Sequence, residues 1–124
     1  MFDTCAKYNI SILLDVHGAM GSQNGFDNSG RASAVWLSDN QYNNTVKSPQ
    51  WLTQFDKDTQ KNGEVDYSHL SWSLKTSEDI LIRWGNHSAF AAFEPVNEPL
   101  WTTRIDVLKD YYRQVRKLVR RYAP

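Results

Sequence analysis

The apolar positions of this chain form two short continuous runs and two stretches with helical spacing. Residues 10–16 read Ile-Ser-Ile-Leu-Leu-Asp-Val, and residues 89–96 read Ala-Phe-Ala-Ala-Phe-Glu-Pro-Val. Short apolar runs of this kind, without strict alternation, are typical of strands buried on both faces of a parallel sheet. We therefore predict strands over residues 10–16 and 89–96.

The helical stretches follow polar segments. Thr76 opens a Thr-Ser-Glu-Asp sequence similar to a capping box, and Gly85-Asn86 suits a left-handed C-terminal cap, so we predict a short helix between them. Residues 104–122 predict an amphipathic helix with a basic outer face. Its predicted apolar stripe consists of Ile105, Leu108, Tyr112, Val115, Leu118, Val119 and Tyr122.

The order of these elements is helix end, strand, long loop, helix, strand, short loop, helix. That order predicts the α/β class, with two βα units and parallel strands. Residues 37–75 read as a long loop or insertion, with short helical turns around residues 48–55 and 67–73, and no internal domain boundary is expected over residues 1–124. Because two parallel strands do not make a stable sheet alone, we expect the chain to be part of a larger fold.

Composition narrows the function classes. Fourteen Lys and Arg balance 14 Asp and Glu, which argues against an electrostatic nucleic-acid binder. The single cysteine, Cys5, excludes an internal disulfide and a multi-cysteine zinc site. No apolar run reaches the roughly 18 residues of a membrane span. The first residues lack a basic segment followed by an apolar stretch, so no signal peptide is expected in this chain.

Candidate chemistry lies directly after each predicted strand. The first segment, residues 17–30, reads His-Gly-Ala-Met-Gly-Ser-Gln-Asn-Gly-Phe-Asp-Asn-Ser-Gly. The second, residues 94–99, reads Glu-Pro-Val-Asn-Glu-Pro. In α/β barrels the carboxyl ends of the strands form the edge that carries the active site.

These two segments together resemble glycoside hydrolase family five, in particular its fungal and oomycete exo-β-1,3-glucanase branch. Asn97-Glu98-Pro99 is similar to the acid/base motif of that family, and residues 15–30 are similar to the loop of that branch, with Met20 where those enzymes usually carry proline. The resemblance covers residues 5–36 and 76–122. It implies a partial (β/α)8 TIM barrel, in which this chain supplies the third and fourth strands.

The resemblance also implies roles for individual residues. Glu98 would be the general acid/base, and a partly desolvated site would favour the protonated form that such a donor needs. Asn97 would contact the sugar 2-hydroxyl, and Phe26 would be an aromatic clamp. The residues expected to bind substrate are His17, Phe26, Asp27, Asn28, Asn97 and Trp101. An equally good interpretation of Trp101 is a hydrophobic contact between a loop and a helix.

A retaining glycosidase needs a second carboxylate as nucleophile. Glu94 lies four residues before Glu98, so the two would project at different depths of the strand, and we expect Glu94 to form hydrogen bonds inside the barrel. The resemblance implies a nucleophile on the seventh strand, outside this chain. It implies no cofactor, and the residues show no metal-ligand spacing.

The expected function is exo-acting hydrolysis of β-1,3-glucan with release of glucose, by a full-length parent that is extracellular or in the cell wall. The expected partner is a β-glucan polysaccharide or oligosaccharide, with no nucleic acid. Two alternatives stay open. One is a β-1,4-glucan or mannan hydrolase of the same family; the other is a carbohydrate-binding or truncated structural module without turnover.

Overall fold

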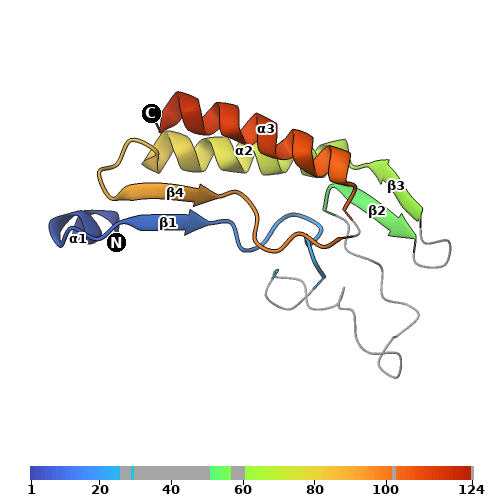
Figure 1. The fold of residues 1–124 in the computed structure, drawn as a ribbon, viewed down its shortest axis with the longest axis horizontal. Helices are drawn as coiled ribbons and strands as arrows, with labels where there is room; N and C mark the ends of the chain where they lie inside the picture. The colour runs from blue at the N-terminus through green and yellow to red at the C-terminus, as the bar shows by residue number, and fades with distance from the viewer. Residues whose placement is uncertain (26–28, 30–50, 57–60, 102, 124) are drawn as a thin grey trace, which may run out of the picture.

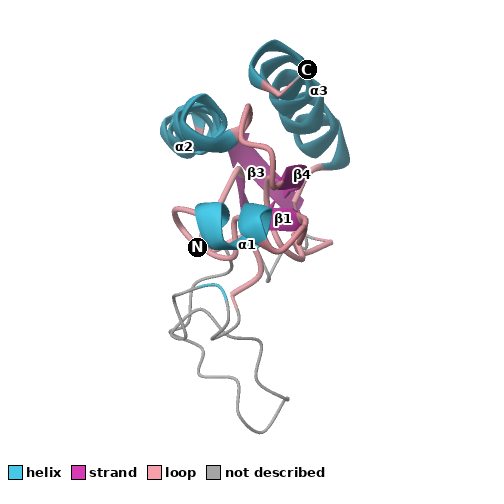
Figure 2. Ribbon diagram, turned by 90° about the vertical axis from the view of Figure 1, so that its left-hand side faces the viewer, coloured by secondary structure: helices cyan, strands magenta, loops and turns pink. Residues whose placement is uncertain are grey.

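A computed structural model describes residues 1–25, 29, 51–56, 61–101 and 103–123 of the chain. Its elements, in order, are α1 (Phe2–Lys7), β1 (Ile12–Asp15), β2 (Thr53–Asp56), β3 (Lys61–Val65), α2 (Tyr67–Trp84), β4 (Phe90–Glu94) and α3 (Ile105–Tyr122). Figure 1 shows α2 and α3 side by side along one face of the β1–β4 pair. The end-on view in Figure 2 shows the same arrangement, with α1 at the start of β1.

The two apolar runs do form neighbouring parallel strands, as predicted. β1 pairs with β4 in a register that runs from Ile12 opposite Phe90 to Asp15 opposite Glu94, with an irregularity after Ile12. Both strands are shorter than predicted, since each ends before its terminal Val16 or Val96. The described elements therefore include, in the predicted order, a strand, a helix, a parallel strand and a helix, with β2 and β3 between β1 and α2.

The stretch expected as a loop over residues 37–75 contains regular structure where it is described. β2 and β3 form an antiparallel hairpin, so the helical turn predicted around residues 48–55 is wrong for residues 53–55, which lie in β2. The turn predicted at residues 67–73 is the beginning of α2. The hairpin leads directly into this helix (Figure 1).

Helix α2 begins at Tyr67, nine residues before the predicted cap at Thr76. Its N-cap is Asp66, whose side chain accepts hydrogen bonds from the backbone N–H groups of Ser68 and His69 at 3.1 and 3.0 Å. Thr76 instead lies inside the helix, so the capping-box prediction is wrong. An acidic side chain that accepts hydrogen bonds from two backbone N–H groups satisfies more of the unpaired donors at a helix start than a threonine in mid-helix does.

The end of α2 was predicted at the correct place but for a different reason. Gly85 has right-handed angles, φ −58° and ψ −29°, and not the predicted left-handed conformation. A Cβ at this position would lie 2.6 Å from the carbonyl oxygen of Leu81 and 2.7 Å from that of Tyr122. Glycine therefore allows the ends of α2 and α3 to approach each other closely.

The buried stripe of α3 matches the prediction at Val115, with Leu108 and Val119 packed beside it, and differs from the prediction at other positions. Val107, Tyr111 and Val115 are buried, whereas Ile105 and Tyr112 are 62% and 39% exposed. These buried residues pack with Trp51, Leu52 and Val96 in one cluster. Helix α3 thus docks through a tyrosine and two valines on the segment that leaves β4.

Trp51 fixes the hairpin to both helices. Its indole N–H donates to Ser73 of α2 at 2.8 Å, and its ring meets Tyr111 of α3 edge-on at 5.2 Å between centroids. The Nδ1 of His69 lies 2.9 Å from the carbonyl oxygen of Trp51. Trp51 and His69 are therefore structural residues.

The prediction that residues 10–16 are buried on both faces is not met within this chain. Ile10 is 55% exposed and Leu13 is 58% exposed. In the described part of the chain, β1 pairs with β4 alone. Its second edge and one of its faces are therefore uncovered here. No described helix is both long and apolar enough to cross a membrane.

Candidate active site

The two candidate segments leave the sheet side by side. The backbone N–H of Val16 donates to the carbonyl oxygen of Glu94 at 3.0 Å, and the N–H of Asn97 donates to the carbonyl oxygen of Val16 at 3.1 Å. These bonds continue the parallel pairing beyond the ends of β1 and β4. As a result, His17 and Asn97 follow adjacent strand ends, as the sequence predicted.

A side chain that sequence reasoning did not single out joins the two segments. Gln23 is fully buried. Its Nε2 donates to the carbonyl oxygens of His17 at 3.0 Å and Asn97 at 2.9 Å. Its Oε1 accepts from the N–H of Ala19 at 3.0 Å, and its own carbonyl accepts from the N–H of Leu100 at 3.0 Å.

The loop that carries Gln23 is a tight turn. Gly21 and Gly25 have φ of 82° and 77°, which explains glycine at both positions. Ser22, at φ 67°, also adopts the left-handed region, and its Oγ accepts from the N–H of Gly25 at 2.8 Å. Ser22 and Ser29 share a short hydroxyl contact, although three residues between Gly25 and Ser29 are not described.

Asp15 at the end of β1 orients His17. The Nδ1 of His17 lies 2.5 Å from Oδ2 of Asp15. Since an ionised carboxylate has acceptors only, Nδ1 carries the donated proton and Nε2 is left to face other groups. The second carboxylate oxygen of Asp15 is buried without a hydrogen-bond partner among the described residues. His17 itself is exposed, with 55% of its side chain accessible.

Glu98 is exposed and lies in a strained turn. Its φ is 43°, in the left-handed region that residues other than glycine adopt at a cost of about 1–3 kcal/mol. Strained backbone of this kind clusters at functional sites, which makes Glu98 a candidate independently of its motif. The partial desolvation expected for a proton donor is absent here, because the described part of the chain leaves Glu98 exposed.

The other predicted site residues fall into two groups. Asn97 is half-buried, with its backbone in the junction of the two loops, and Trp101 is 75% exposed beside them. The predicted residues Phe26, Asp27 and Asn28 lie outside the described residues. The structure therefore brings the backbones of His17 and Asn97 together at the strand ends, and Glu98 and Trp101 follow Asn97 along the chain.

Glu94, the last residue of β4, is half-buried. Its Cα partner across the sheet is Asp15. Burial raises the pKa of Tyr112 on α3, and the negative charge of Glu94 adds to that effect. Hydrogen bonding of Glu94 inside a barrel stays a prediction.

Tyr111 of α3 holds the second segment, residues 94–99, through a hydrogen bond to its backbone. Its hydroxyl donates to the carbonyl oxygen of Pro95 at 3.0 Å and lies 3.2 Å from the hydroxyl of Ser77 on α2. Burial raises the pKa of Tyr111 to about 12. Sequence reasoning missed this residue because the predicted stripe of α3 placed Tyr112 inward. A helical stripe through Val107, Tyr111 and Val115, four positions apart, was the available signal.

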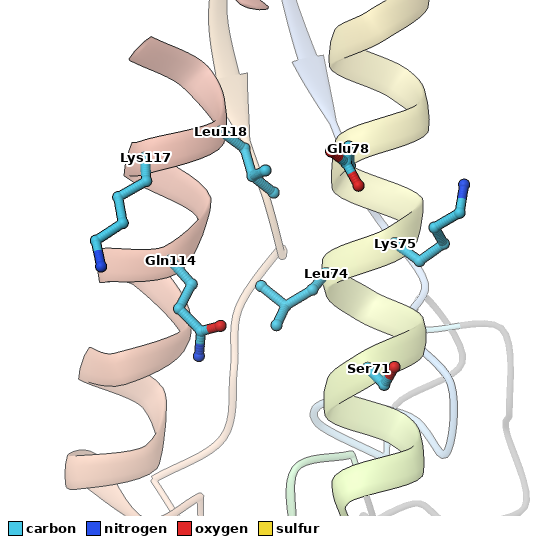
Figure 3. Close-up of a pocket in the computed structure, with 7 residues that line it drawn as sticks. All are labelled: Ser71, Leu74, Lys75, Glu78, Gln114, Lys117 and Leu118. Carbon is cyan, nitrogen blue, oxygen red and sulfur yellow. The ribbon is translucent and has the colours of Figure 1, made fainter. Parts of the chain in front are cut away.

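A pocket of about 430 Å³ lies elsewhere, in the groove between α2 and α3. Figure 3 shows Leu74 and Leu118 facing each other there, with Lys75, Glu78, Gln114 and Lys117 around them. None of the predicted site residues lines this pocket. Within the described residues, no three His, Cys, Asp or Glu side chains are close enough together to hold a metal ion.

Comparison with known proteins gives relatives whose names include glucan 1,3-beta-glucosidase. No family model matches the chain. A protein named glucan 1,3-beta-glucosidase from Pichia angusta is 35% identical over 118 residues, which are 94% of this chain and 22% of the relative. One of the same name from Schwanniomyces occidentalis is 32% identical over 114 residues, 90% of this chain and 21% of that protein.

A shorter match has higher identity. The sporulation-specific glucan 1,3-beta-glucosidase of Saccharomyces cerevisiae is 49% identical over 51 residues, which are 40% of this chain and 12% of that protein. The chain spans about a fifth of the length of the curated relatives that match most of it. Over 90% or more of its length, the chain is therefore similar to one segment of proteins named glucan 1,3-beta-glucosidase.

Proposed function

We propose that this chain is the segment of a family-five glycoside hydrolase that carries the general acid/base and part of the sugar site. The proposed activity is exo-hydrolysis of β-1,3-glucan with release of glucose. The observation that carries the proposal is the junction of the two loops, where Asn97 pairs with Val16 at 3.1 Å and Gln23 bridges His17 and Asn97. Relatives named glucan 1,3-beta-glucosidase support the reaction class.

In the proposed mechanism, Glu98 donates a proton to the glycosidic oxygen as the bond to the anomeric carbon breaks. A carboxylate about 5 Å away, on a strand outside this chain, attacks that carbon and forms a glycosyl ester. Water then attacks the anomeric carbon, the bond from that carbon to the carboxylate breaks, and ionised Glu98 takes the proton of the water. The reaction uses no cofactor.

The proposed sugar contacts come from both loops. His17, oriented by Asp15, presents Nε2 to a sugar hydroxyl, and Asn97 binds the 2-hydroxyl. Trp101, exposed and three residues after Glu98 in the chain, offers a face for stacking on a ring. Phe26, Asp27 and Asn28 complete the pocket by the family resemblance.

The proposed fold is a partial (β/α)8 barrel. A parallel pair of strands with helices over one face is the repeating unit of such a barrel. The exposed apolar side chains Ile10 and Leu13 and the unpaired edge of β1 would contact the rest of the barrel. A barrel of about 250 residues would also account for relatives much longer than this chain.

The test is a segment chimera, in which this chain replaces the matching segment of the Pichia angusta relative. The chimera is assayed for glucose release from β-1,3-glucan, with β-1,4-glucan and mannan as comparison substrates. Proton NMR of the first glucose formed identifies its anomer. We expect hydrolysis of β-1,3-glucan and initial release of the β-anomer, because the mechanism retains configuration.

Each other result changes the proposal in a defined way. A folded but inactive chimera would contradict a catalytic role and favour a binding or structural module. Faster hydrolysis of β-1,4-glucan or mannan would contradict the linkage, and an initial α-anomer would contradict the mechanism. If the whole-segment chimera does not fold, residues 15–30 and 94–101 alone are exchanged, and the same results decide.

A further inference from the structure

The environment of Gln23 is unusual for a loop side chain. It is fully buried, and both ends of its carboxamide are hydrogen-bonded to backbone groups. The two segments that it joins are far apart in sequence, since Gln23 and Asn97 are separated by 74 positions. The chain therefore uses one side chain to connect the loop after β1 with the loop after β4.

The chemistry of the contact accepts few other residues. The two carbonyl oxygens of His17 and Asn97 need two donors on one atom, and the N–H of Ala19 needs an acceptor on the neighbouring atom. A primary carboxamide supplies that set. Glutamate has no donor when ionised, methionine has none at all, and asparagine has the group on a shorter side chain.

The bridge acts on residues that the proposed function uses. It holds the backbone of His17 on one side and that of Asn97, directly before Glu98, on the other. The carbonyl of Gln23 also accepts from Leu100, directly after the Asn-Glu-Pro motif. Glu98 therefore lies in a turn held at Asn97 and Leu100 by the same residue.

We infer that Gln23 is a positioning residue that sets where Glu98 lies relative to His17. The inference rests on the proposed function, since it assigns Gln23 to the same reaction. Gln23 acts through the two loops and not through the substrate. A displacement of about 1 Å in a reacting group costs roughly 10²-fold in rate.

The test compares two substrates in the active segment chimera, a β-1,3-glucan and an aryl glucoside with an activated leaving group. The second needs little proton donation to its leaving oxygen. Gln23→Met should lower kcat on glucan by about 10–100-fold and lower kcat on the aryl glucoside much less. Gln23→Glu should show the same selectivity at neutral pH.

Gln114 offers the matched control. It lies on α3, outside the proposed site, and its Nε2 donates to the carboxylate of Asp110 on the same helix at 2.8 Å. Gln114→Met and Gln114→Glu should leave both rates within about twofold of the parent, as is usual for surface changes. The folded fraction of each variant is measured by circular dichroism and used to correct its rate.

The outcomes separate the two proposals. A folded but inactive parent chimera overturns both. If the parent chimera is active and the Gln23 variants lose activity on both substrates equally, in step with the folded fraction, the positioning role alone is overturned. Unchanged rates on both substrates overturn it as well. If Gln23→Met does not fold, Gln23→Asn is measured in its place, and failure of all three variants to fold makes Gln23 structural and overturns the inference.

Discussion

Tyr111 shows how one side chain couples the helix layer to the candidate site. It is 1% exposed, and its hydroxyl donates to Pro95, three residues before Glu98. A buried phenol that donates a hydrogen bond resists ionisation, and burial raises its pKa to about 12. The contact therefore contributes to stability only while Tyr111 is protonated.

The raised pKa predicts a loss of stability in alkali. The folded pKa is above the unfolded value of 10.0, so the contribution is complete below about pH 10 and falls by about 1.4 kcal/mol per pH unit up to about pH 12. Tyr111→Phe should cost about 1 kcal/mol near neutral pH from the lost hydrogen bond. Its deficit relative to the parent should shrink and then reverse as the pH rises through this range.

Urea unfolding of the segment chimera, with and without Tyr111→Phe, measures this difference at a series of pH values. A deficit that stays constant through the alkaline range would contradict the assigned role of the hydroxyl.

The sequence correctly located the candidate residues at the ends of adjacent strands, whereas it missed a contact that joins two segments. Glu98, Asn97 and His17 were expected at adjacent strand ends, and the hydrogen bond from Asn97 to Val16 brings those ends together. Gln23 lies inside the recognised loop, but its bridge exists only once both loops are folded. No local pattern contains that information.

At the scale of elements, the start of α2 and the hairpin before it were not predicted, because their sequences are polar. Helix α2 runs for 18 residues from Tyr67, and its first turns carry serines and a histidine that read as loop. The hairpin was missed because the apolar content of residues 51–65 is low and irregular. Tertiary contacts of Trp51 hold this region, and such contacts override local propensity.

The observed cap predicts a difference between two substitutions. Asp66→Ala removes the acceptor for Ser68 and His69 and should lower the free energy of unfolding by about 1 kcal/mol. Thr76→Ala is the matched control, because Thr76 lies within the helix, where alanine is the better helix former. It should leave stability unchanged or slightly raised.

The effect of Asp66 should also depend on pH. Its hydrogen bonds to Ser68 and His69 lower the pKa of the Asp66 carboxyl below 3.8. The stabilisation is therefore present above the unfolded pKa and is lost as the pH falls through the lower folded value. Urea midpoints of the segment chimera at neutral and acidic pH measure this. A larger cost for Thr76→Ala than for Asp66→Ala would contradict the assigned helix start.

At the scale of the whole molecule, the sheet lacks partners within the described chain. β1 has an unpaired edge, and Ile10 and Leu13 are more than half exposed. Two-stranded sheets are marginal in water, and an uncovered apolar edge promotes aggregation. The sequence predicted the parallel pair correctly, but it could not show what covers β1, because that depends on residues beyond the pair.

These exposed surfaces predict the behaviour of residues 1–124 expressed alone. The isolated chain should unfold without a sharp thermal transition, and it should release no glucose from β-1,3-glucan, because Glu98 lacks a nucleophile about 5 Å away. Calorimetry and a glucose assay test this, with the segment chimera as control. A sharp transition together with glucose release would contradict the prediction and would make Glu94 a candidate for the second carboxylate.

The central claim, that Glu98 is the general acid/base, is tested most directly by Glu98→Ala in the segment chimera. The measurement is kcat/KM on β-1,3-glucan and on an aryl glucoside with an activated leaving group, with the exposed Glu64 of β3 changed to alanine as control. We predict a loss of about 10²–10⁴-fold on glucan, a much smaller loss on the aryl glucoside, and no change for Glu64→Ala. An unchanged rate on glucan, or an equal loss on both substrates, would contradict the assignment.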